Sequence, residues 1–230
     1  MNDSLLFQIA VTMIPGIGNV YARALVNRFG TPEAVFKAPK KELESIEGIG
    51  NKRLQAILKF DFKKAEEEIG FIEKHKIKPL FFQDEEYPKR LLNCYDSPAM
   101  LFYKGTSDLN ASRIIAIVGT RNPSEYGRSI CENLVKELAG QDVIIVSGLA
   151  FGIDTMAHKA SLKNGIETIG VLAHGLDRIY PTENRSIAKQ MLQAGGLLTE
   201  FRHGTLPDKQ NFPSRNRIVA GMCDCIVVIE

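Results

Sequence analysis

The run Ile114-Ile-Ala-Ile-Val-Gly-Thr-Arg121 decides the fold of this chain. Five apolar residues, most of them β-branched, precede a glycine, and the similar run Val143-Ile-Ile-Val-Ser147 follows after a helical pattern. Further short apolar runs at 168–172, 197–200 and 226–229 are separated by segments of helix length. Continuous apolar strands that alternate with helices are typical of a parallel sheet covered on both faces. The sequence therefore predicts an α/β fold with a doubly wound, mainly parallel sheet.

The first sixty or so residues predict helices only, arranged as an internal duplication. Each copy consists of a helix, a turn that contains Gly-Ile-Gly, and a second helix. The copies are 5–13, Pro15-Gly16-Ile17-Gly18 and 19–29, followed by 43–46, Glu47-Gly48-Ile49-Gly50 and 51–60. A charged amphipathic helix between 60 and 78 then connects to short strands expected at 79–82 and 100–103. We therefore expect a small all-α domain at 1–65 and an extended sheet domain at 66–230.

Composition favours a globular protein, and its net charge is too small to imply nucleic-acid binding by itself. Among the 230 residues, 24% are charged and the net charge is +2, so a phosphate-binding site has to come from a local cluster of cations. The four cysteines form no C-x-x-C pair, and we expect neither a metal nor a cofactor. With no basic segment leading into an apolar stretch at the N-terminus and no run of membrane-spanning length, the expected location is the cytoplasm.

The loops that follow the first two predicted strands of the parallel sheet do not suit a dinucleotide. Gly119-Thr120-Arg121 departs from the G-x-G-x-x-G pattern of Rossmann domains, and Ser147-Gly148 stands where an acidic residue would hold a ribose. A bound NAD is therefore disfavoured in this Rossmann-like sheet. Arg121 could instead pair with a phosphate or stack on a base, while the alternative is a surface arginine beside a carboxylate.

A basic segment with one aromatic residue lies near the end of the chain. Residues 202–217 contain four Lys or Arg side chains and Phe212, against the single acid Asp208. Cations for phosphates beside a ring for base stacking are what a single-stranded nucleic acid needs. Arg215 and Arg217 could equally cap or cross-link the domain.

Two other patterns have competing interpretations. Ser147, Asp154 and His158 resemble parts of a hydrolase, but Asp154 and His158 lie one helical turn apart and no G-x-S-x-G elbow exists, so we expect His158 to be packed in the core. The Gly-Ile-Gly turns resemble helix-hairpin-helix motifs, whose backbone amides bind DNA phosphates. The residues of the second turn proposed for this secondary contact are Gly48, Gly50, Lys52 and Arg53. Such tandem hairpins also occur as structural or partner-binding domains.

Four ordered motifs together resemble the DprA/Smf DNA-processing family across essentially the whole chain. They are G-T-R-x-x-S-x-Y-G at 119–127, S-G-L-A-x-G-I-D-x-x-A-H at 147–158, G-L-D with Y-P-x-x-N at 175–184, and F-P-x-R-N-R-I-x-A-G at 212–221. The resemblance implies a homodimer without catalysis that binds and protects single-stranded DNA, displaces single-strand-binding protein and loads the RecA recombinase during transformation. It also implies a SAM-like or hairpin N-terminal domain. The DNA-binding residues that it implies are Gly119, Thr120, Arg121, Ser147, Gly148, Lys209, Phe212, Arg215, Asn216 and Arg217.

Alternatives to this function belong to other classes. The Rossmann variant is similar to the lysine-decarboxylase-like nucleotide hydrolases, although their P-G-G-x-G-T-x-x-E motif is missing here. The hairpins could also recruit partners, with the sheet as a scaffold. Many members of the DprA/Smf family continue into a further helix and a winged-helix domain, whereas these 230 residues stop at Glu230 after an apolar strand. We therefore expect either an unusual closure of the sheet or a chain that continues, and no winged-helix domain within 66–230.

Overall fold

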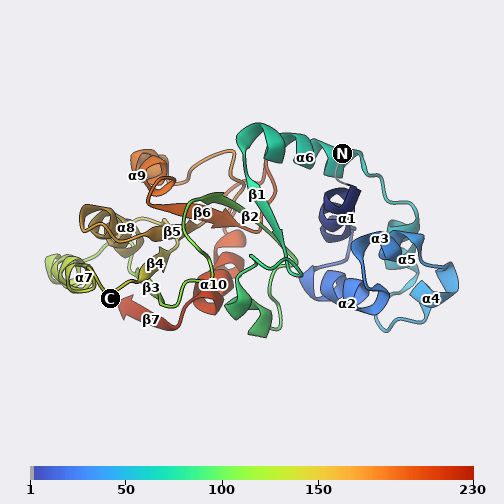
Figure 1. The fold of residues 1–230 in the computed structure, drawn as a ribbon, viewed down its shortest axis with the longest axis horizontal. Helices are drawn as coiled ribbons and strands as arrows, with labels where there is room; N and C mark the ends of the chain where they lie inside the picture. Colours follow the sequence, from blue (N-terminus) through green and yellow to red (C-terminus); the bar gives the residue numbers. More distant parts are fainter. Residues whose placement is uncertain (1–2) are drawn as a thin grey trace.

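A computed structural model describes residues 3–230 of the chain, as helices and strands in the order that Figure 1 labels. The helices are α1 (Asp3–Thr12), α2 (Asn19–Phe29), α3 (Pro32–Lys37), α4 (Lys40–Glu44), α5 (Asn51–Leu58), α6 (Lys63–His75), α7 (Glu125–Glu137), α8 (Ile153–Lys163), α9 (Arg185–Met191) and α10 (Asn211–Met222), with 3-10 turns η1 (Lys89–Asn93) and η2 (Thr182–Asn184). The strands are β1 (Lys78–Phe81), β2 (Met100–Gly105), β3 (Ile114–Gly119), β4 (Ile144–Ser147), β5 (Thr168–Val171), β6 (Gly195–Thr199) and β7 (Cys225–Ile229).

One seven-stranded sheet organises the C-terminal part of the molecule. Its strand order is β1-β2-β6-β5-β4-β3-β7, in which β3 to β7 are parallel to their neighbours within that group. The strands β1 and β2 extend the sheet beyond β6 as antiparallel neighbours. The predicted fold class, a Rossmann-like and mainly parallel sheet preceded by a small helical domain, is confirmed.

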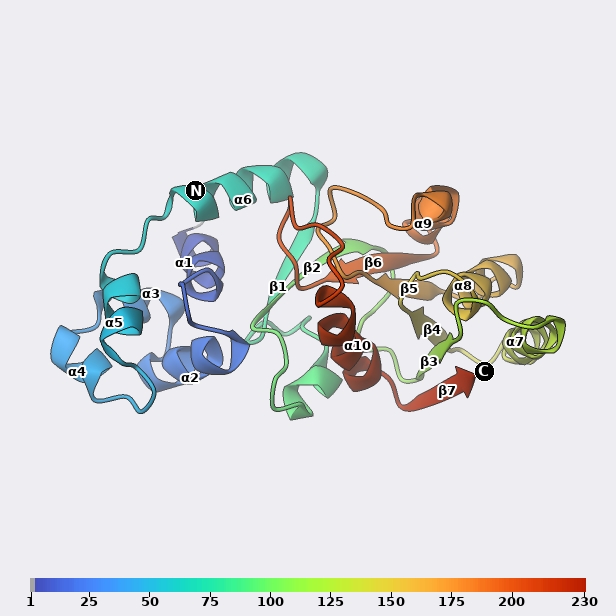
Figure 2. The same ribbon diagram turned by 180° about the vertical axis from the view of Figure 1, so that it is seen from behind.

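Helices cover both faces of the parallel strands. Alternate side chains of β4 point to opposite faces, so that Ile144 and Val146 join the apolar cluster that contains α10, whereas Ile145 joins the cluster of α7 and α8. Figures 1 and 2 show α7, α8 and α9 on the outer side of the sheet and α10 on the side that faces the helical region. Because both faces are covered, the functional loops lie at the carboxyl edge of the strands.

The helical region, α1 to α5, shares its core with the sheet. One apolar cluster includes Ile9 of α1, Ile69 of α6, Leu101 of β2 and Ile218 of α10, all of them buried. The domain boundary expected between residues 65 and 66 falls in the first turn of α6 and stays a prediction.

Polar contacts also fix the first Gly-Ile-Gly turn against the sheet. Asn19 begins α2, and its side-chain amide donates to the Glu200 carboxylate (3.1 Å) and accepts from the Ala99 backbone N–H (3.0 Å). The Glu200 carboxylate also pairs with Arg217 of α10. The start of α2 is therefore connected through Glu200 to the helix that carries much of the predicted basic segment.

Most element boundaries follow the sequence closely. The helix predicted at 19–29 is confirmed, the helix at 51–60 ends two residues earlier, and the strand at 197–200 occupies Gly195–Thr199. The helix predicted at 43–46 is displaced, because α4 ends at Glu44. Pro32 begins α3, a helix that the sequence analysis did not predict, with Thr31 capping its N-terminus.

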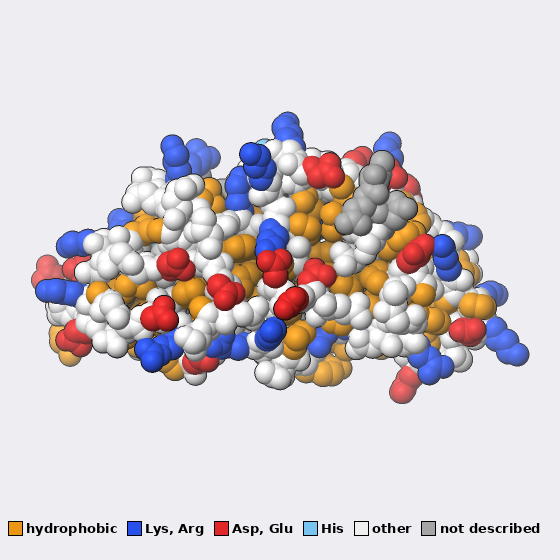
Figure 3. All heavy atoms as spheres, viewed as in Figure 1, with side chains coloured by type: hydrophobic (Ala, Val, Ile, Leu, Met, Phe, Trp, Pro, Cys, Tyr) orange, Lys and Arg blue, Asp and Glu red, His pale blue; other side chains and the backbone are white. Residues whose placement is uncertain are grey.

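Surface charge is mixed. In the face of the molecule that Figure 3 shows, basic and acidic side chains are interspersed along its whole length. Across residues 3–230, no helix combines the length and the apolar character required to cross a bilayer. A nucleic-acid site in the described part of the chain therefore depends on a local arrangement of cations.

Candidate nucleic-acid interface

The loops after β3 and β4 lie side by side, because these strands are parallel neighbours in the sheet. The Ile153 N–H donates to the Thr120 carbonyl (3.1 Å), which joins the start of α8 to the Arg121 loop. Gly152 makes this approach possible: its φ is +79°, and a Cβ atom there would lie 2.2 Å from the Thr120 oxygen. The two loops therefore form one rigid edge.

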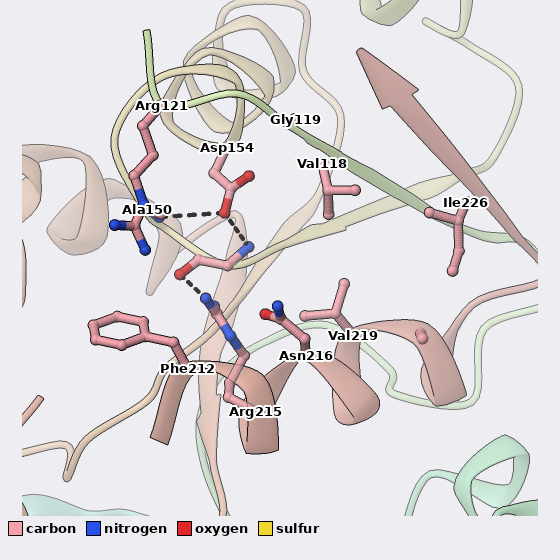
Figure 4. A pocket seen from close by; sticks show the side chains of 12 residues that line it. Val118, Gly119, Arg121, Ala150, Asp154, Phe212, Arg215, Asn216, Val219 and Ile226 are labelled. Carbon is pink, nitrogen blue, oxygen red and sulfur yellow. Dashed lines mark hydrogen bonds between the residues drawn. The ribbon is translucent and has the colours of Figure 1, made fainter. Parts of the chain in front are cut away.

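Arg215 holds this edge from beneath. It is 3% exposed, and its guanidinium donates to the carbonyls of Gly148, which follows β4, and of Val171, which ends β5. Figure 4 marks the hydrogen bond to Gly148. A side chain at Gly148 would collide with it, since a Cβ would lie 2.2 Å from an Arg215 nitrogen. Burial lowers the pKa of Arg215 to about 10, so the side chain remains charged at neutral pH.

Asp154 completes this buried support. One carboxylate oxygen accepts from the backbone N–H groups of Gly148 (3.1 Å) and Ala150 (3.4 Å), as the dashed lines in Figure 4 mark. Burial raises the pKa of this carboxyl group, while the charge of Arg215 acts in the opposite direction. The carboxylate is thus used to order the loop at 148–150.

Above this support, a cation and two aromatic rings face an open cavity. The Arg121 side chain is exposed, and its guanidinium carbon lies 5.6 Å from the centre of the Phe212 ring, in the arrangement drawn in Figure 4. The Tyr180 ring, 45% exposed, lies 6.1 Å from the Phe212 ring. These side chains and the exposed Lys209 line a cavity of about 580 Å³. A smaller hollow of about 300 Å³ adjoins it and also contains Asn216.

The electrostatics of the larger cavity are positive. Within residues 3–230, neither Arg121 nor Lys209 pairs with a carboxylate, and no acidic residue lines this cavity. The adjoining hollow of about 300 Å³ is lined by one acidic residue, Asp154, whose carboxylate already accepts hydrogen bonds from backbone amides. The cavity therefore offers unpaired positive charge beside the exposed Tyr180 ring and the half-buried Phe212 ring.

The N-terminus of α7, where this type of fold often holds a phosphate, is already capped by acid. The Glu230 carboxylate accepts hydrogen bonds from the backbone N–H (2.9 Å) and the hydroxyl of Ser124, the N-cap residue. An anion bound at this helix end would have to displace a carboxylate. Arg121 and Lys209, in contrast, form no ion pair within residues 3–230.

Ser147, Asp154 and His158 do not form a catalytic constellation. Ser147 is fully buried and donates to the Ile117 carbonyl (2.6 Å). His158 is also fully buried, with its Nδ1 atom 2.7 Å from the Thr168 hydroxyl, and burial lowers its pKa to about 3. The structure therefore gives His158 the core-packing role that the sequence favoured.

Two family models match different segments of this chain. Residues 78–230 match the family described as DNA recombination-mediator protein A, and residues 9–60 match a SAM-like tandem of helix-hairpin-helix motifs. The chain belongs to the DNA recombination-mediator protein A family. The resemblance to DprA/Smf proteins found in the four sequence motifs is thereby confirmed.

Individual proteins similar in sequence to this chain carry the names Smf and DprA. The chain is 34% identical to protein Smf of Synechocystis over its full length and 46% identical to the DNA processing protein DprA of Bacillus subtilis over 64% of its length. It spans 59% and 50% of the length of these two curated relatives.

Solved structures of family members are also similar. The X-ray structure of DprA from Streptococcus pneumoniae superposes with a TM-score of 0.82 at 31% identity, over 98% of this chain and 77% of that one. DprA from Helicobacter pylori superposes with a TM-score of 0.59 at 31% identity, over 66% of this chain and 68% of that one. The latter structure concerns the mode in which that protein binds single-stranded DNA.

In this member of the DNA recombination-mediator protein A family, the predicted site residues separate into two groups. The residues that reach the cavities from the carboxyl edge are Gly119, Arg121, Gly148, Lys209, Phe212 and Asn216. Their contact with DNA stays a prediction. Thr120 lies between Gly119 and Arg121, where its hydroxyl accepts from the Asn122 N–H (3.2 Å).

Ser147, Arg215 and Arg217 make contacts within the protein, and their contact with DNA also stays a prediction. Ser147 and Arg215 are buried beneath the loops, and Arg217 pairs with Glu200 and Asp96. These contacts give both arginines the cross-linking role, and Arg215 in addition lines the smaller hollow of about 300 Å³. The sequence could not show this, because the carbonyl groups that Arg215 reaches follow different strands.

The second Gly-Ile-Gly turn also uses its arginine internally. The Arg53 guanidinium donates to the carbonyls of Gly16 (2.8 Å) and Gly48 (2.5 Å) and lies 4.2 Å from the Tyr21 ring centre. Arg53 thereby bridges the two turns. Lys52 is exposed and forms no ion pair with residues 3–230, so a DNA contact through this hairpin rests on Lys52 and the backbone of Gly48 and Gly50.

The structure adds features that the sequence analysis missed. Tyr180 joins the aromatic wall through its distance to Phe212, a relation that only the folded chain shows. His203, which lies within residues 202–217, has its ring nitrogen 2.5 Å from the buried Glu68 carboxylate and its ring stacked on Phe71. This contact ties α6 to the loop that carries Lys209.

Proposed function

We propose that this chain binds single-stranded DNA at the carboxyl edge of its sheet and carries out no chemistry on it. The observation that carries the proposal is the cavity of about 580 Å³ in which Arg121 and Lys209 are unpaired beside Phe212 and Tyr180. Cations follow a phosphate backbone irrespective of sequence, and aromatic rings stack on any base. Paired bases in a duplex cannot reach such a ring, so the site favours a single strand.

Two observations support binding without catalysis. The buried Asp154 carboxylate is engaged with loop amides, and His158 has no exposed surface from which to accept a proton. A nucleotide hydrolase of the lysine-decarboxylase-like group would need a carboxylate facing the cavity. Release of free base or ribose phosphate from nucleotides, absent in an Arg121→Glu variant, would establish that alternative instead.

Family membership extends the proposal to the biological role. We infer that the chain acts as a cytoplasmic homodimer that protects incoming single-stranded DNA and loads RecA in place of single-strand-binding protein. The support is the match of residues 78–230 to the recombination-mediator family. RecA filament formation on DNA coated with single-strand-binding protein, measured by ATP hydrolysis with and without this chain, tests this role.

The binding test is a salt-titrated anisotropy assay with fluorescent oligo-dT, with unlabelled duplex as competitor. We expect submicromolar affinity and preference for the single strand, with log K falling as log salt rises by about 0.7 for each phosphate contacted. The double variant Arg121→Glu/Lys209→Glu should bind about 100-fold more weakly and show a smaller salt slope, because two contacts become repulsive.

Matched charge reversals make this test specific. Arg28 and Lys136 are exposed and lie away from the cavity, so Arg28→Glu/Lys136→Glu carries the same change in net charge. We expect it to bind nearly as well as wild type. Equal binding by a folded Arg121→Glu/Lys209→Glu protein would show that the proposed pocket is wrong.

A further inference from the structure

A second hollow lies on the other side of Arg121. Its volume is about 620 Å³, and Arg128, Phe151, Lys159 and Glu183 are among the residues around it. Arg121 and Phe151 line both this hollow and the cavity of about 580 Å³. The two depressions are therefore neighbours that share a wall.

The cations of this second hollow are available to a ligand. Arg128 is exposed and uses one guanidinium N–H for the Pro123 carbonyl (3.3 Å), while Lys159 is exposed and has no carboxylate partner within residues 3–230. Lys163 follows one helical turn after Lys159 and lines a third hollow of about 460 Å³, which shares Lys159 and Glu183 with the second. Glu183 is the one acidic residue among those that line these two hollows. Positive charge therefore continues along the exposed face of α8.

Phe151 stands at the junction between the two larger depressions. It is 43% exposed and lines both of them. The Leu149 carbonyl accepts from the Asn184 amide (2.9 Å), and the Ala150 carbonyl accepts from the Thr155 hydroxyl (2.6 Å). Together with Gly152 packed on Thr120, these bonds hold the loop in place. Phe151 is thus presented outward by a rigid backbone.

We propose that this second hollow is a further subsite for the same DNA strand, with Phe151 as a second stacking platform. The strand passes from Lys209 and Phe212 across Arg121, stacks a base on Phe151, and places its following phosphates along Arg128, Lys159 and Lys163. This inference rests on the proposed function. Its physical basis is that an exposed ring held rigidly between unpaired cations loses little conformational entropy when it stacks on a base.

The subsite predicts how affinity depends on the length of the DNA. A short oligonucleotide such as dT6 fills the cavity of about 580 Å³, whereas dT20 also reaches the second hollow of about 620 Å³. We expect Phe151→Ala to lower the affinity for dT20 about tenfold, within the range measured for loss of one stacked base, and to lower the affinity for dT6 by a smaller factor, because Phe151 also borders the cavity of about 580 Å³. Lys159→Glu/Lys163→Glu, at residues that do not line that cavity, should lower the affinity for dT20 and its salt slope and leave the affinity for dT6 within about twofold of wild type.

Matched variants and a local probe complete the experiment. Tyr126 is 73% exposed on α7 and Lys136 is exposed near its end, so Tyr126→Ala and Lys136→Glu serve as controls that should bind both oligonucleotides like wild type. A 2-aminopurine base placed at successive positions of dT20 should be quenched at two separate positions in wild type, and at one position in Phe151→Ala.

The outcomes separate this inference from the proposed function. If Phe151→Ala and Lys159→Glu/Lys163→Glu remain folded by thermal unfolding and keep the wild-type ratio of dT20 to dT6 affinity, the subsite does not exist. If they retain DNA binding but lose binding to an acidic peptide, the surface is a protein interface and the inference is overturned. If wild type binds neither oligonucleotide, the proposed function itself fails.

Discussion

The carboxyl edge of the sheet and the Gly-Ile-Gly hairpins both carry arginines beside glycine-containing loops, but they use them differently. At the sheet edge, Arg215 is buried and holds the loops, and this leaves Arg121 exposed and unpaired above them. At the hairpins, Arg53 bridges the two turns and Arg23 contacts Ser97 and the Phe82 ring. The hairpin arginines therefore already have partners within the protein. At the sheet edge, one arginine stabilises the loops and the other forms no ion pair with the described residues and is exposed to solvent.

A cation in a sequence motif can therefore not be assigned to ligand binding from its spacing alone. Spacing places the charge near a turn, but the side chain is available to a ligand only when nearby carbonyl or carboxylate groups do not already bind it. If the two roles are separate, a substitution of a supporting residue should lower stability, whereas a substitution of an exposed cation should leave stability nearly unchanged. The expected changes are given from the largest to the smallest.

Replacing Arg215 should destabilise the fold far more than replacing Arg121. Arg215→Met leaves the Gly148 and Val171 carbonyls without their guanidinium partner, and we expect a loss of about 3 kcal/mol in the free energy of unfolding. The exposed Arg121→Met should change it by less than about 0.5 kcal/mol. Urea unfolding followed by circular dichroism measures both. Similar losses from the two substitutions would remove the distinction between supporting and available arginines.

Acid should destabilise the fold through the buried His158. Its pKa is about 3 in the folded state because of burial, against 6.5 for an exposed histidine. Below pH 6.5, His158 takes up a proton in the unfolded chain but not in the folded chain. The free energy of unfolding therefore falls as the pH falls toward 3. From this residue alone we expect a loss of roughly 1.5 kcal/mol between pH 6.5 and pH 5.

The check on the histidine prediction is a pair of matched variants. His158→Gln keeps a hydrogen-bonding group near Thr168 and should reduce the loss of stability between the two pH values, measured by urea unfolding at each. His75 is exposed on α6, and His75→Gln should retain the wild-type loss. An unchanged pH dependence in His158→Gln would mean that this histidine does not sense acid through burial.

The smallest expected changes concern the second hairpin. Arg53→Ala removes the bridge between the turns and the contact with Tyr21, so we expect about 1 kcal/mol less stability and an unchanged affinity for oligo-dT. Lys52→Glu should alter stability by less than about 0.5 kcal/mol, because the side chain is exposed. Its affinity for oligo-dT should remain within twofold of wild type in the anisotropy assay. A loss comparable to that of Arg121→Glu would instead make the hairpin a DNA contact.

The sequence predicted the sheet well because its strands are short apolar runs separated by helices. It predicted Arg121, Lys209 and Phe212 as candidates because cations and an aromatic residue follow strands whose carboxyl ends share one edge. It could not predict that β2 would pair antiparallel with β6, since strand pairing depends on contacts that are distant in the sequence.

The contacts of the individual site residues could not be predicted for a similar reason. Arg215 and Arg217 differ from Arg121 in their burial and partners, and neither property can be read from residue type. Phe151 and Tyr180 were not singled out as site residues because a lone aromatic in a loop carries no periodic signal. Their importance arises only where the fold places them beside Arg121 and Phe212.

The apolar cluster that runs from α1 through α6 and β2 to α10 also limits how this protein can be rebuilt. The segments that match two family models appear modular along the sequence, yet they share one interior. A chimaera that takes residues 9–60 from a relative must therefore inherit side chains that fit Ile69 and Leu101, or accept cavities at the seam. When hairpins are exchanged between relatives, the stability of the chimaera therefore depends first on how well the new segment packs against the shared core.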